Sequence, residues 1–315
     1  MATRSMFTLN TGAEMPAVGF GTWQSKPGEV QAAVSYALQN GYRLVDCAYC
    51  YGNEDEVGKG LKEAFESGAG AATVRREDVF VMTKAWATYN TRIEEGLDKS
   101  LKSLGLDYVD LYLIHWPVLL NPKGNHDKFP TLPDGSRDVI RDWNHIEAWK
   151  QMEALLSTGK VKAIGVCNYS KRYLEELLNH ARVVPAINQI ENHPSLPQQE
   201  IVDLCRARGI HVVAYSPLGS TGSPLFAAEP VVRVAERRGV GPGTVLLSYH
   251  VARGNTVLAK SVTPSRIKAN LDIVPLDAED MKLLDDYSAE LTRRGELKRY
   301  VYPPFGVEFG FPDKS

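Results

Sequence analysis

Four ionisable or phenolic side chains stand where apolar stretches of this sequence give way to polar ones. Asp46 and Tyr51 lie at the end of the stretch R-L-V-D-C-A-Y-C-Y, and Lys84 ends V-F-V-M-T-K. His115 comes directly after V-D-L-Y-L-I. Each apolar or β-branched stretch predicts a buried strand. A buried strand has no structural use for such groups where it ends, so their positions indicate chemistry.

Together these four groups can deliver a proton to an oxyanion. A free tyrosine has a pKa of about 10, which is too high for efficient proton exchange near neutrality. A neighbouring Lys84 ammonium is expected to lower the pKa of Tyr51, and Asp46 would offset the cost of burying that ammonium. His115 can hydrogen-bond a substrate oxygen. An oxyanion that needs only a proton arises when hydride adds to a carbonyl, so the set predicts carbonyl reduction.

Each of these residues also has a purely structural explanation. Lys84 could extend to solvent along the surface, Asp46 could cap a helix, and His115 could be a hydrogen-bonded core histidine. For a single residue that explanation would prevail, because buried polar groups are usually just paired. Four such groups at successive strand ends favour the functional interpretation.

A hydride donor must bind somewhere, yet the sequence has neither a G-x-G-x-x-G nor a G-x-x-x-x-G-K phosphate loop. The segment K-S-V-T-P-S-R (260–266) ends a predicted strand and begins a helix, with Thr263 expected as its N-cap. Helix N-termini bind phosphate. Lys260 and Arg266 add positive charge, and Ser261 adds a hydroxyl, which suits the 2′-phosphate of NADP. An ordinary capped helix with surface cations fits the segment alone equally well.

Further strand ends carry groups suited to a flat, polar ligand. Asn168 and Gln189 could hold a carboxamide, and Tyr215 could stack on a ring. Aromatic residues usually belong to the core, but three tryptophans at strand ends favour a pocket wall. These are Trp23, Trp86 and Trp116.

Strand-like and helix-like stretches alternate eight times, which predicts a parallel sheet closed as a (β/α)8 TIM barrel in one domain, residues 1–315. Strands are expected at 18–23, up to Asp46, and at 79–83, 108–114, 163–168, 186–190, 211–217 and 256–261. Helices are expected at 28–40, 54–67, 92–104, 144–158, 171–181, 198–208, 243–253 and from Pro264. The C-terminal ends of barrel strands all open on the active-site face.

Three segments exceed this repeat. A short hairpin is expected about Asn10–Gly12 and should plug the bottom of the barrel. The long loop 118–142 and the aromatic C-terminal tail (296–315) should lie over the active site, where long loops carry specificity.

The bulk composition is that of an ordinary globular protein. Of 315 residues, 43% are hydrophobic and 23% charged, and the formal net charge is −2, which gives no case for nucleic acid or membrane partners. No signal peptide or apolar span is recognisable, so we expect a cytoplasmic monomer acting on a small molecule. The C-x-x-C of Cys47 and Cys50 lies between strand and loop rather than at a helix start, so we expect packing rather than redox or metal chemistry.

Over essentially its whole length the chain resembles the aldo-keto reductases. The resemblance implies NADPH-dependent reduction of aldehydes and some ketones on a barrel fold. The stretch W-Q-S-K-P (23–27) and the short segment after Leu218 look most like fungal NADP-dependent glycerol dehydrogenases and glyceraldehyde (aldose) reductases, so glyceraldehyde, glycerol or small sugar aldehydes are the expected substrates. The matching stretches are G-F-G-T-W (19–23), G-Y-R-L-V-D-C-A-Y-C-Y-G-N-E-D-E-V-G (41–58), L-G-L-D-Y-V-D-L-Y-L-I-H-W-P (104–117), A-I-N-Q-I-E-N-H-P (186–194), A-Y-S-P-L-G-S (214–220) and K-S-V-T-P-S-R-I-K-A-N (260–270).

The resemblance also implies residue roles. Tyr51 would be the general acid, tuned by Lys84 and Asp46, with His115 orienting the carbonyl. Substrate would contact Trp23, Tyr51, Trp86, His115 and Trp116. NADP(H) would contact Gly21, Thr22, Trp23, Asp46, Cys167, Asn168, Gln189, Tyr215, Ser216, Leu218, Ser220, Lys260, Ser261, Val262, Thr263, Arg266 and Asn270. The chain departs from the family at Cys167, usually serine, at Ala259, usually proline, and at Ala269, usually acidic.

Two other classes of protein could share these features. The fold also resembles potassium-channel β-subunits and some lens crystallins, which would make the chain a non-catalytic NADP-binding barrel, but the complete Asp–Tyr–Lys–His set favours an enzyme. A metal-dependent barrel hydrolase would need clustered ligands at strand ends, and His115 and Asp46 stand there beside a lysine, so no metal is expected.

Overall fold

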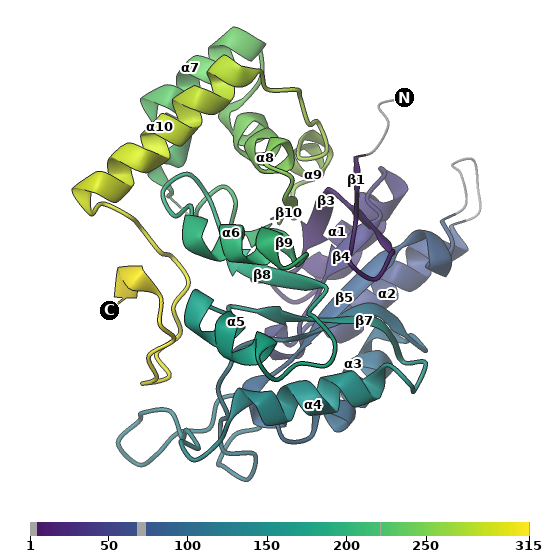
Figure 1. The fold of residues 1–315 in the computed structure, drawn as a ribbon. Coiled ribbons are helices and arrows are strands. Elements are labelled where there is room, and N and C mark those ends of the chain that lie inside the picture. Colours follow the sequence, from purple (N-terminus) through teal and green to yellow (C-terminus); the bar gives the residue numbers. More distant parts are fainter. Residues whose placement is uncertain (1–4, 68–73, 221, 315) are drawn as a thin grey trace.

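The computed structural model describes residues 5–67, 74–220 and 222–314. Residue 221 of the segment after Leu218 and residue 315 of the predicted tail lie outside the described residues. Eight strands form a closed barrel in the order β10-β3-β4-β5-β6-β7-β8-β9, as Figure 1 shows. All its pairings are parallel, and Val257 of β10 pairs with Val18 of β3 to close the ring. The predicted barrel is confirmed.

Each barrel strand coincides with one of the eight predicted apolar stretches. These stretches are rich in β-branched and aliphatic residues because a strand of a parallel barrel is covered on both faces. The strands are β3 (Val18–Gly21), β4 (Leu44–Asp46), β5 (Phe80–Ala85), β6 (Val109–Ile114), β7 (Val161–Cys167), β8 (Ile187–Glu191), β9 (His211–Tyr215) and β10 (Thr256–Ala259).

Helices surround the barrel, and their apolar faces pack on the outer side of the strands to form the larger hydrophobic core. The predicted helices appear as α1 (Glu29–Gln39), α2 (Glu54–Glu66), α3 (Ile93–Leu104), α4 (His145–Leu155), α5 (Lys171–Leu178), α6 (Gln199–Ala207), α8 (Pro242–Ala252) and α9 (Pro264–Ala269). Short 3-10 helices are η1 (Tyr49–Tyr51), η2 (Arg76–Asp78), η3 (Ala87–Tyr89), η4 (Pro224–Ala227) and η5 (Pro312–Lys314).

Two helices were not predicted from the sequence: α7 (Glu229–Arg238) and α10 (Ala278–Arg294). The helix expected from Pro264 ends at Ala269, and α10 is a separate helix that starts at an Asp277 capping box. Both missed helices are additions to the barrel repeat, so strand–helix alternation could not predict them. They pack against each other and α8 in a separate apolar cluster.

The N-terminal hairpin closes one end of the barrel, as predicted. Its strands are β1 (Met6–Thr8) and β2 (Glu14–Pro16), joined through Gly12 at φ 82°. Leu9 and Met15 are buried among the side chains that fill the barrel interior. In Figure 1 the hairpin lies on the side of the barrel away from the C-terminal tail.

The C-terminal tail is fastened to the other end of the barrel by a buried carboxylate. Glu191, at the end of β8, accepts the backbone N–H groups of Tyr300 and Val301, both at 2.8 Å. Arg299 and Asp313 form an ion pair at 2.7 Å that ties the start of the tail to its end. The tail is therefore held at the face where the strands end.

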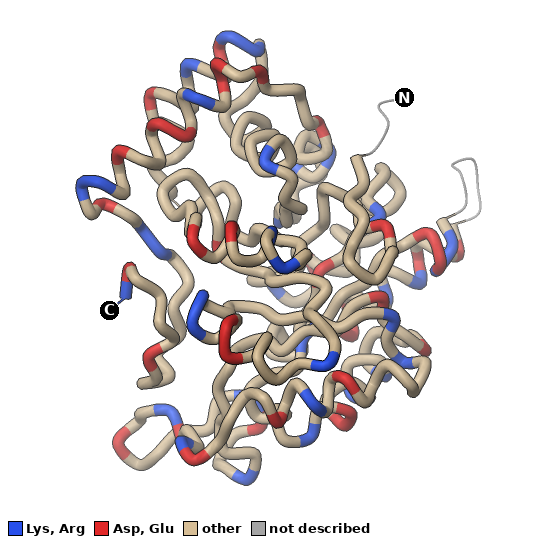
Figure 2. Tube along the Cα trace, viewed as in Figure 1, with Lys and Arg blue, Asp and Glu red and all other residues tan. Residues whose placement is uncertain are grey.

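The surface carries both signs of charge interleaved along its helices, as Figure 2 shows. Within the described ranges, no helix is both long enough and apolar enough to cross a membrane.

Candidate active site

A buried ammonium group lies at the centre of the predicted catalytic set. The Lys84 side chain is 0% exposed. Its Nζ donates to the Asp46 carboxylate at 2.6 Å, to the Cys47 carbonyl at 2.8 Å and to the Tyr51 hydroxyl at 3.2 Å. These three acceptors use all three N–H donors of the ammonium. Lys84 therefore joins the end of β4, strand β5 and the turn η1 in one polar network.

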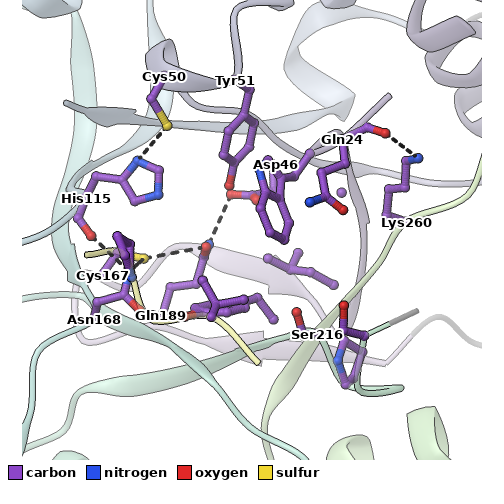
Figure 3. A pocket seen from close by; sticks show the side chains of 18 of the residues that line it. Gln24, Asp46, Cys50, Tyr51, His115, Cys167, Asn168, Gln189, Ser216 and Lys260 are labelled. Atoms are coloured by element: carbon purple, nitrogen blue, oxygen red, sulfur yellow. Dashed lines mark hydrogen bonds between the residues drawn. The ribbon is translucent and has the colours of Figure 1, made fainter. Parts of the chain in front are cut away.

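His115 follows β6 and faces the Tyr51 ring, with 5.8 Å between the ring centroids. Burial, together with the charge of Lys84, holds the pKa of His115 well below its usual range, so the imidazole is neutral at physiological pH. The Cys50 sulfur lies 3.5 Å from its Nδ1 (Figure 3). Because burial raises the pKa of the Cys50 thiol, that group keeps its proton and can donate it to Nδ1. The ring proton then resides on Nε2.

The pKa of Tyr51 departs from the sequence prediction. Tyr51 is half-buried and lines the cavity, and burial raises its pKa well above the usual value, with a further contribution from the charge of Asp46. The prediction of a lowered pKa is wrong, because burial and the Asp46 carboxylate outweigh the Lys84 ammonium. Tyr51 is a neutral phenol at physiological pH and carries a proton to donate.

Two amide side chains continue the network across the barrel. Gln189 Nε2 donates to Asp46 Oδ1 at 3.0 Å, as Figure 3 shows. Asn168 donates to the His115 carbonyl at 3.0 Å and accepts from the Tyr215 hydroxyl at 2.7 Å. The residues predicted to hold the nicotinamide carboxamide and ring therefore lie next to Tyr51, the predicted proton donor.

A cavity of about 710 Å³ opens over these groups at the C-terminal ends of the strands. Trp86 and Trp116 are buried in its wall, whereas Trp23 is 40% exposed. The predicted residues that line it are Gly21, Trp23, Asp46, Tyr51, Trp86, His115, Trp116, Cys167, Asn168, Gln189, Tyr215, Ser216, Leu218, Ser220, Lys260 and Arg266.

Comparison with known proteins identifies the family. The family model described as "Aldo/keto reductase family" matches residues 17–289. The chain belongs to the aldo/keto reductase family. It is therefore an oxidoreductase that reduces aldehydes with NADPH, as the sequence predicted.

Named relatives cover nearly all of this aldo/keto reductase. It is 75% identical over 309 residues to the D-galacturonate reductase of Hypocrea jecorina, covering 98% of each chain. It is 48% identical over 312 residues to the glycerol 2-dehydrogenase (NADP(+)) of Saccharomyces cerevisiae, covering 96% of each. The solved structure of the aldose reductase from Schistosoma japonicum superposes with a TM-score of 0.84 at 40% identity, covering 90% of this chain and 91% of that one. The predicted similarity to fungal reductases is confirmed.

Some predicted site residues of this reductase do not line the cavity. Lys84 lies beneath it, and Thr22 is buried, with its hydroxyl donating to the Asp46 carbonyl at 2.9 Å. Thr263 is the N-cap residue of α9, as predicted, although its side chain makes no capping hydrogen bond. Ser261 Oγ accepts the Thr263 N–H instead, at 3.1 Å. The predicted residues outside the lining are Thr22, Lys84, Ser261, Val262, Thr263 and Asn270.

Other lining residues were not singled out from the sequence. Six of them come from the two long segments that were expected to cover the site, the loop 118–142 and the tail. The expectation that these segments approach the cavity was sound, but a loop sequence does not reveal which side chains point inward. The additional residues are Gln24, Cys50, Phe129, Arg137, Pro217, Gly219, Gly222, Ser223, Phe226, Leu258, Ala259, Val301, Pro303, Pro304 and Phe305.

Backbone strain is concentrated at this cavity. Among the described residues, four that are not glycine have a positive φ, and three of them line it: Gln24 at 57°, Asn168 at 61° and Ser216 at 49°. A residue with a side chain pays an energetic penalty for this conformation, which persists where the surroundings enforce it and is common at functional sites. All three lie just after barrel strands, at the face where the cavity opens.

The C-x-x-C should not act as a redox switch. All four cysteines are free, and Cys50 points at His115 while Cys47 is buried. We expect Cys47→Ser and Cys50→Ser to retain most of the aldehyde reductase activity, since a serine hydroxyl can also donate to His115 Nδ1. Activity assays with a mild oxidant should show no reversible inhibition. A loss that dithiothreitol restores in the parent enzyme, but that is absent from Cys50→Ser, would show that this thiol is a regulatory group.

Proposed function

We propose that the protein uses NADPH to reduce the aldehyde group of a sugar or sugar acid, with Tyr51 as the proton donor. D-Galacturonate is the first substrate to test, followed by small sugar aldehydes such as glyceraldehyde. One observation carries the proposal: the Tyr51 hydroxyl contacts the Lys84 ammonium at the base of a cavity whose rim carries Lys260 and Arg266. The names of the two fungal relatives support the substrate class.

NADPH, when bound by these residues, would supply the hydride that adds to the carbonyl carbon of the substrate. The electron pair of the C=O π bond then moves to oxygen, and the resulting alkoxide takes its proton from the Tyr51 hydroxyl. An alkoxide is a far stronger base than a phenolate, so a tyrosine with a raised pKa still donates. Lys84 stabilises the phenolate that remains, and solvent supplies the next proton. His115, protonated on Nε2, donates a hydrogen bond that orients the carbonyl oxygen.

The residues present suit a dinucleotide phosphate. Lys260 and Arg266 line the cavity, are exposed, and form no ion pair with any described carboxylate. We propose that they bind the 2′-phosphate, while Ser216, Leu218 and Ser220 line the pyrophosphate path. Asn168 and Gln189 would hold the carboxamide and Tyr215 would stack on the ring. Cys167, with its sulfur 3.7 Å from Gln189 Oε1, replaces a hydroxyl with a weaker hydrogen-bonding group.

Cofactor preference tests this assignment. A charge-assisted hydrogen bond contributes about 1.5 to 3 kcal/mol, or roughly tenfold to a hundredfold in affinity. We therefore expect Arg266→Ala to lower kcat/KM for NADPH by about tenfold or more, while the value for NADH changes little. Lys268→Ala, which removes an exposed cation of α9 outside the cavity lining, is the matched control and should keep the preference. Equal use of NADPH and NADH by the parent enzyme would refute the proposal.

We also propose that the enzyme acts as a monomer in the cytoplasm. Its four free cysteines suit a reducing compartment. Of the six large apolar side chains exposed among the described residues, Trp23, Phe129 and Phe226 line the cavity rather than forming an interface patch.

A further inference from the structure

A third cation reaches the cavity from the side opposite the proposed phosphate site. Of the described residues that line the cavity, Arg137, Lys260 and Arg266 are the lysines and arginines. Lys260 and Arg266 belong to the β10–α9 segment. Arg137 lies on the loop 118–142, which connects β6 to α4. The 2′-phosphate therefore does not account for Arg137.

Ring contacts place Arg137 at the substrate end of the cavity. Its guanidinium lies over the Phe129 ring, 5.2 Å from the centroid, and its Nη1 donates to the Phe129 carbonyl at 3.1 Å. The Phe129 ring contacts Trp86 at 5.5 Å between centroids, and Trp86 contacts His115 at 5.2 Å. Two aromatic rings thus separate the guanidinium from the histidine that we propose orients the carbonyl.

The loop holds this arginine in a defined position. Arg137 forms an antiparallel β-bridge with Thr131, and Leu132 N–H donates to the Ser136 carbonyl at 2.9 Å. The Thr131 N–H is in turn bound by Asn125 Oδ1 at 2.9 Å. A side chain that is stacked on a ring and mounted on a hydrogen-bonded backbone loses less conformational entropy when it binds a ligand.

The Arg137 guanidinium also has N–H donors that no described protein group accepts. It has five N–H groups, and the hydrogen bond to the Phe129 carbonyl uses one of them. Across the described ranges no carboxylate lies within ion-pair distance of Arg137. An arginine fork that lacks an internal carboxylate and faces a cavity is suited to bind a ligand carboxylate through two parallel hydrogen bonds.

We propose that Arg137 binds the carboxylate of an acidic sugar aldehyde whose aldehyde group faces Tyr51 and His115. This inference rests on the proposed function and makes Arg137 the residue that selects hexuronates over neutral sugars. Stacking on the Phe129 ring fixes the plane of the guanidinium, which favours two parallel hydrogen bonds to a carboxylate. A neutral substrate leaves the partly exposed guanidinium hydrated, and so gains nothing from it.

The test compares an acidic substrate with neutral ones in charge-altered variants. For Arg137→Met we expect kcat/KM for D-galacturonate to fall by about tenfold or more, as for the loss of a charge-assisted pair. For the neutral methyl ester of D-galacturonate and for D-glyceraldehyde it should stay within about twofold, because neither offers a carboxylate. Arg137→Lys keeps the charge but not the fork, and should fall between the parent enzyme and Arg137→Met.

Lys123→Met is the matched control. Lys123 is an exposed cation of the same loop that does not line the cavity, so its removal changes the net charge equally and should leave all three substrates unaffected. An equal loss on acidic and neutral substrates in both Arg137 variants would show that Arg137 only supports the loop. Unchanged D-galacturonate kinetics in folded Arg137→Met would equally overturn the inference. Failure of the parent enzyme to reduce any of the three substrates with NADPH would instead refute the proposed function.

Discussion

Tyr51→Phe is expected to lower kcat for aldehyde reduction by at least about a hundredfold, the usual effect of losing a general acid. The substitution removes the hydroxyl that accepts from Lys84 and leaves the ring in place. No other described phenol contacts the Lys84 ammonium, so no neighbouring group can take over the proton transfer. Steady-state kinetics with D-glyceraldehyde at saturating NADPH provide the measurement.

Two controls separate loss of the proton donor from damage to the site. NADPH binding, followed by quenching of tryptophan fluorescence, should barely change in Tyr51→Phe, because the hydroxyl is not among the proposed cofactor contacts. Tyr49→Phe removes a second phenol from the same turn, one that bonds to Asp127 and Tyr89 and does not line the cavity. It should retain nearly normal turnover. Near-normal turnover in Tyr51→Phe would mean that another group is the acid.

The barrel and the position of its site could be predicted because both depend on local chemistry. A strand covered on both faces must be apolar, so Lys84 or His115 at the end of such a strand is conspicuous in the sequence. Parallel pairing then brings those strand ends to one face without any knowledge of side-chain geometry. Tyr51 could be predicted for the same reason, because it closely follows such a strand, although it lies in the 3-10 helix η1.

The direction of the Tyr51 pKa shift could not be predicted from the sequence, because burial and the charge of Lys84 oppose each other at this residue. A neighbouring lysine predicts a lowered tyrosine pKa, but the direction of the shift depends on how deeply the tyrosine is buried and where the Asp46 carboxylate lies. In the structure Asp46 is 2.6 Å from the ammonium, and its charge also opposes ionisation of Tyr51. Such competing effects are decided by distances, which no spacing pattern contains.

Loop residues were unpredictable for a different reason. Arg137 and Phe129 reach the cavity because the loop 118–142 folds into bridged turns, with Thr131 opposite Arg137 and Leu120 opposite Val139. These pairings depend on tertiary contacts rather than on a repeated pattern. The tail reaches the cavity because the buried Glu191 carboxylate captures its backbone, and a glutamate at the end of a strand gives no indication of that partner.

Lys84→Met should both destabilise the protein and abolish most of its activity. The substitution preserves the length of the side chain but leaves the Asp46 carboxylate, which is 4% exposed, without its counter-ion. Removing one partner of a buried ion pair typically costs about 3 to 5 kcal/mol in the free energy of unfolding. Turnover should fall because the phenolate of Tyr51 would lose the neighbouring positive charge. Urea denaturation and steady-state kinetics measure the two effects separately.

The double variant Asp46→Asn/Lys84→Met distinguishes the structural role of this pair from its proposed catalytic role. Neither substituted side chain is charged, and an amide oxygen at position 46 can still accept from Gln189, so much of the lost stability should return. Turnover should not return, because no ammonium remains to stabilise the phenolate. If the double variant regained both properties, the buried pair would serve only to satisfy its own charges. If Lys84→Met alone were as stable as the parent enzyme, the Asp46 carboxylate would have to be far better hydrated than its burial indicates.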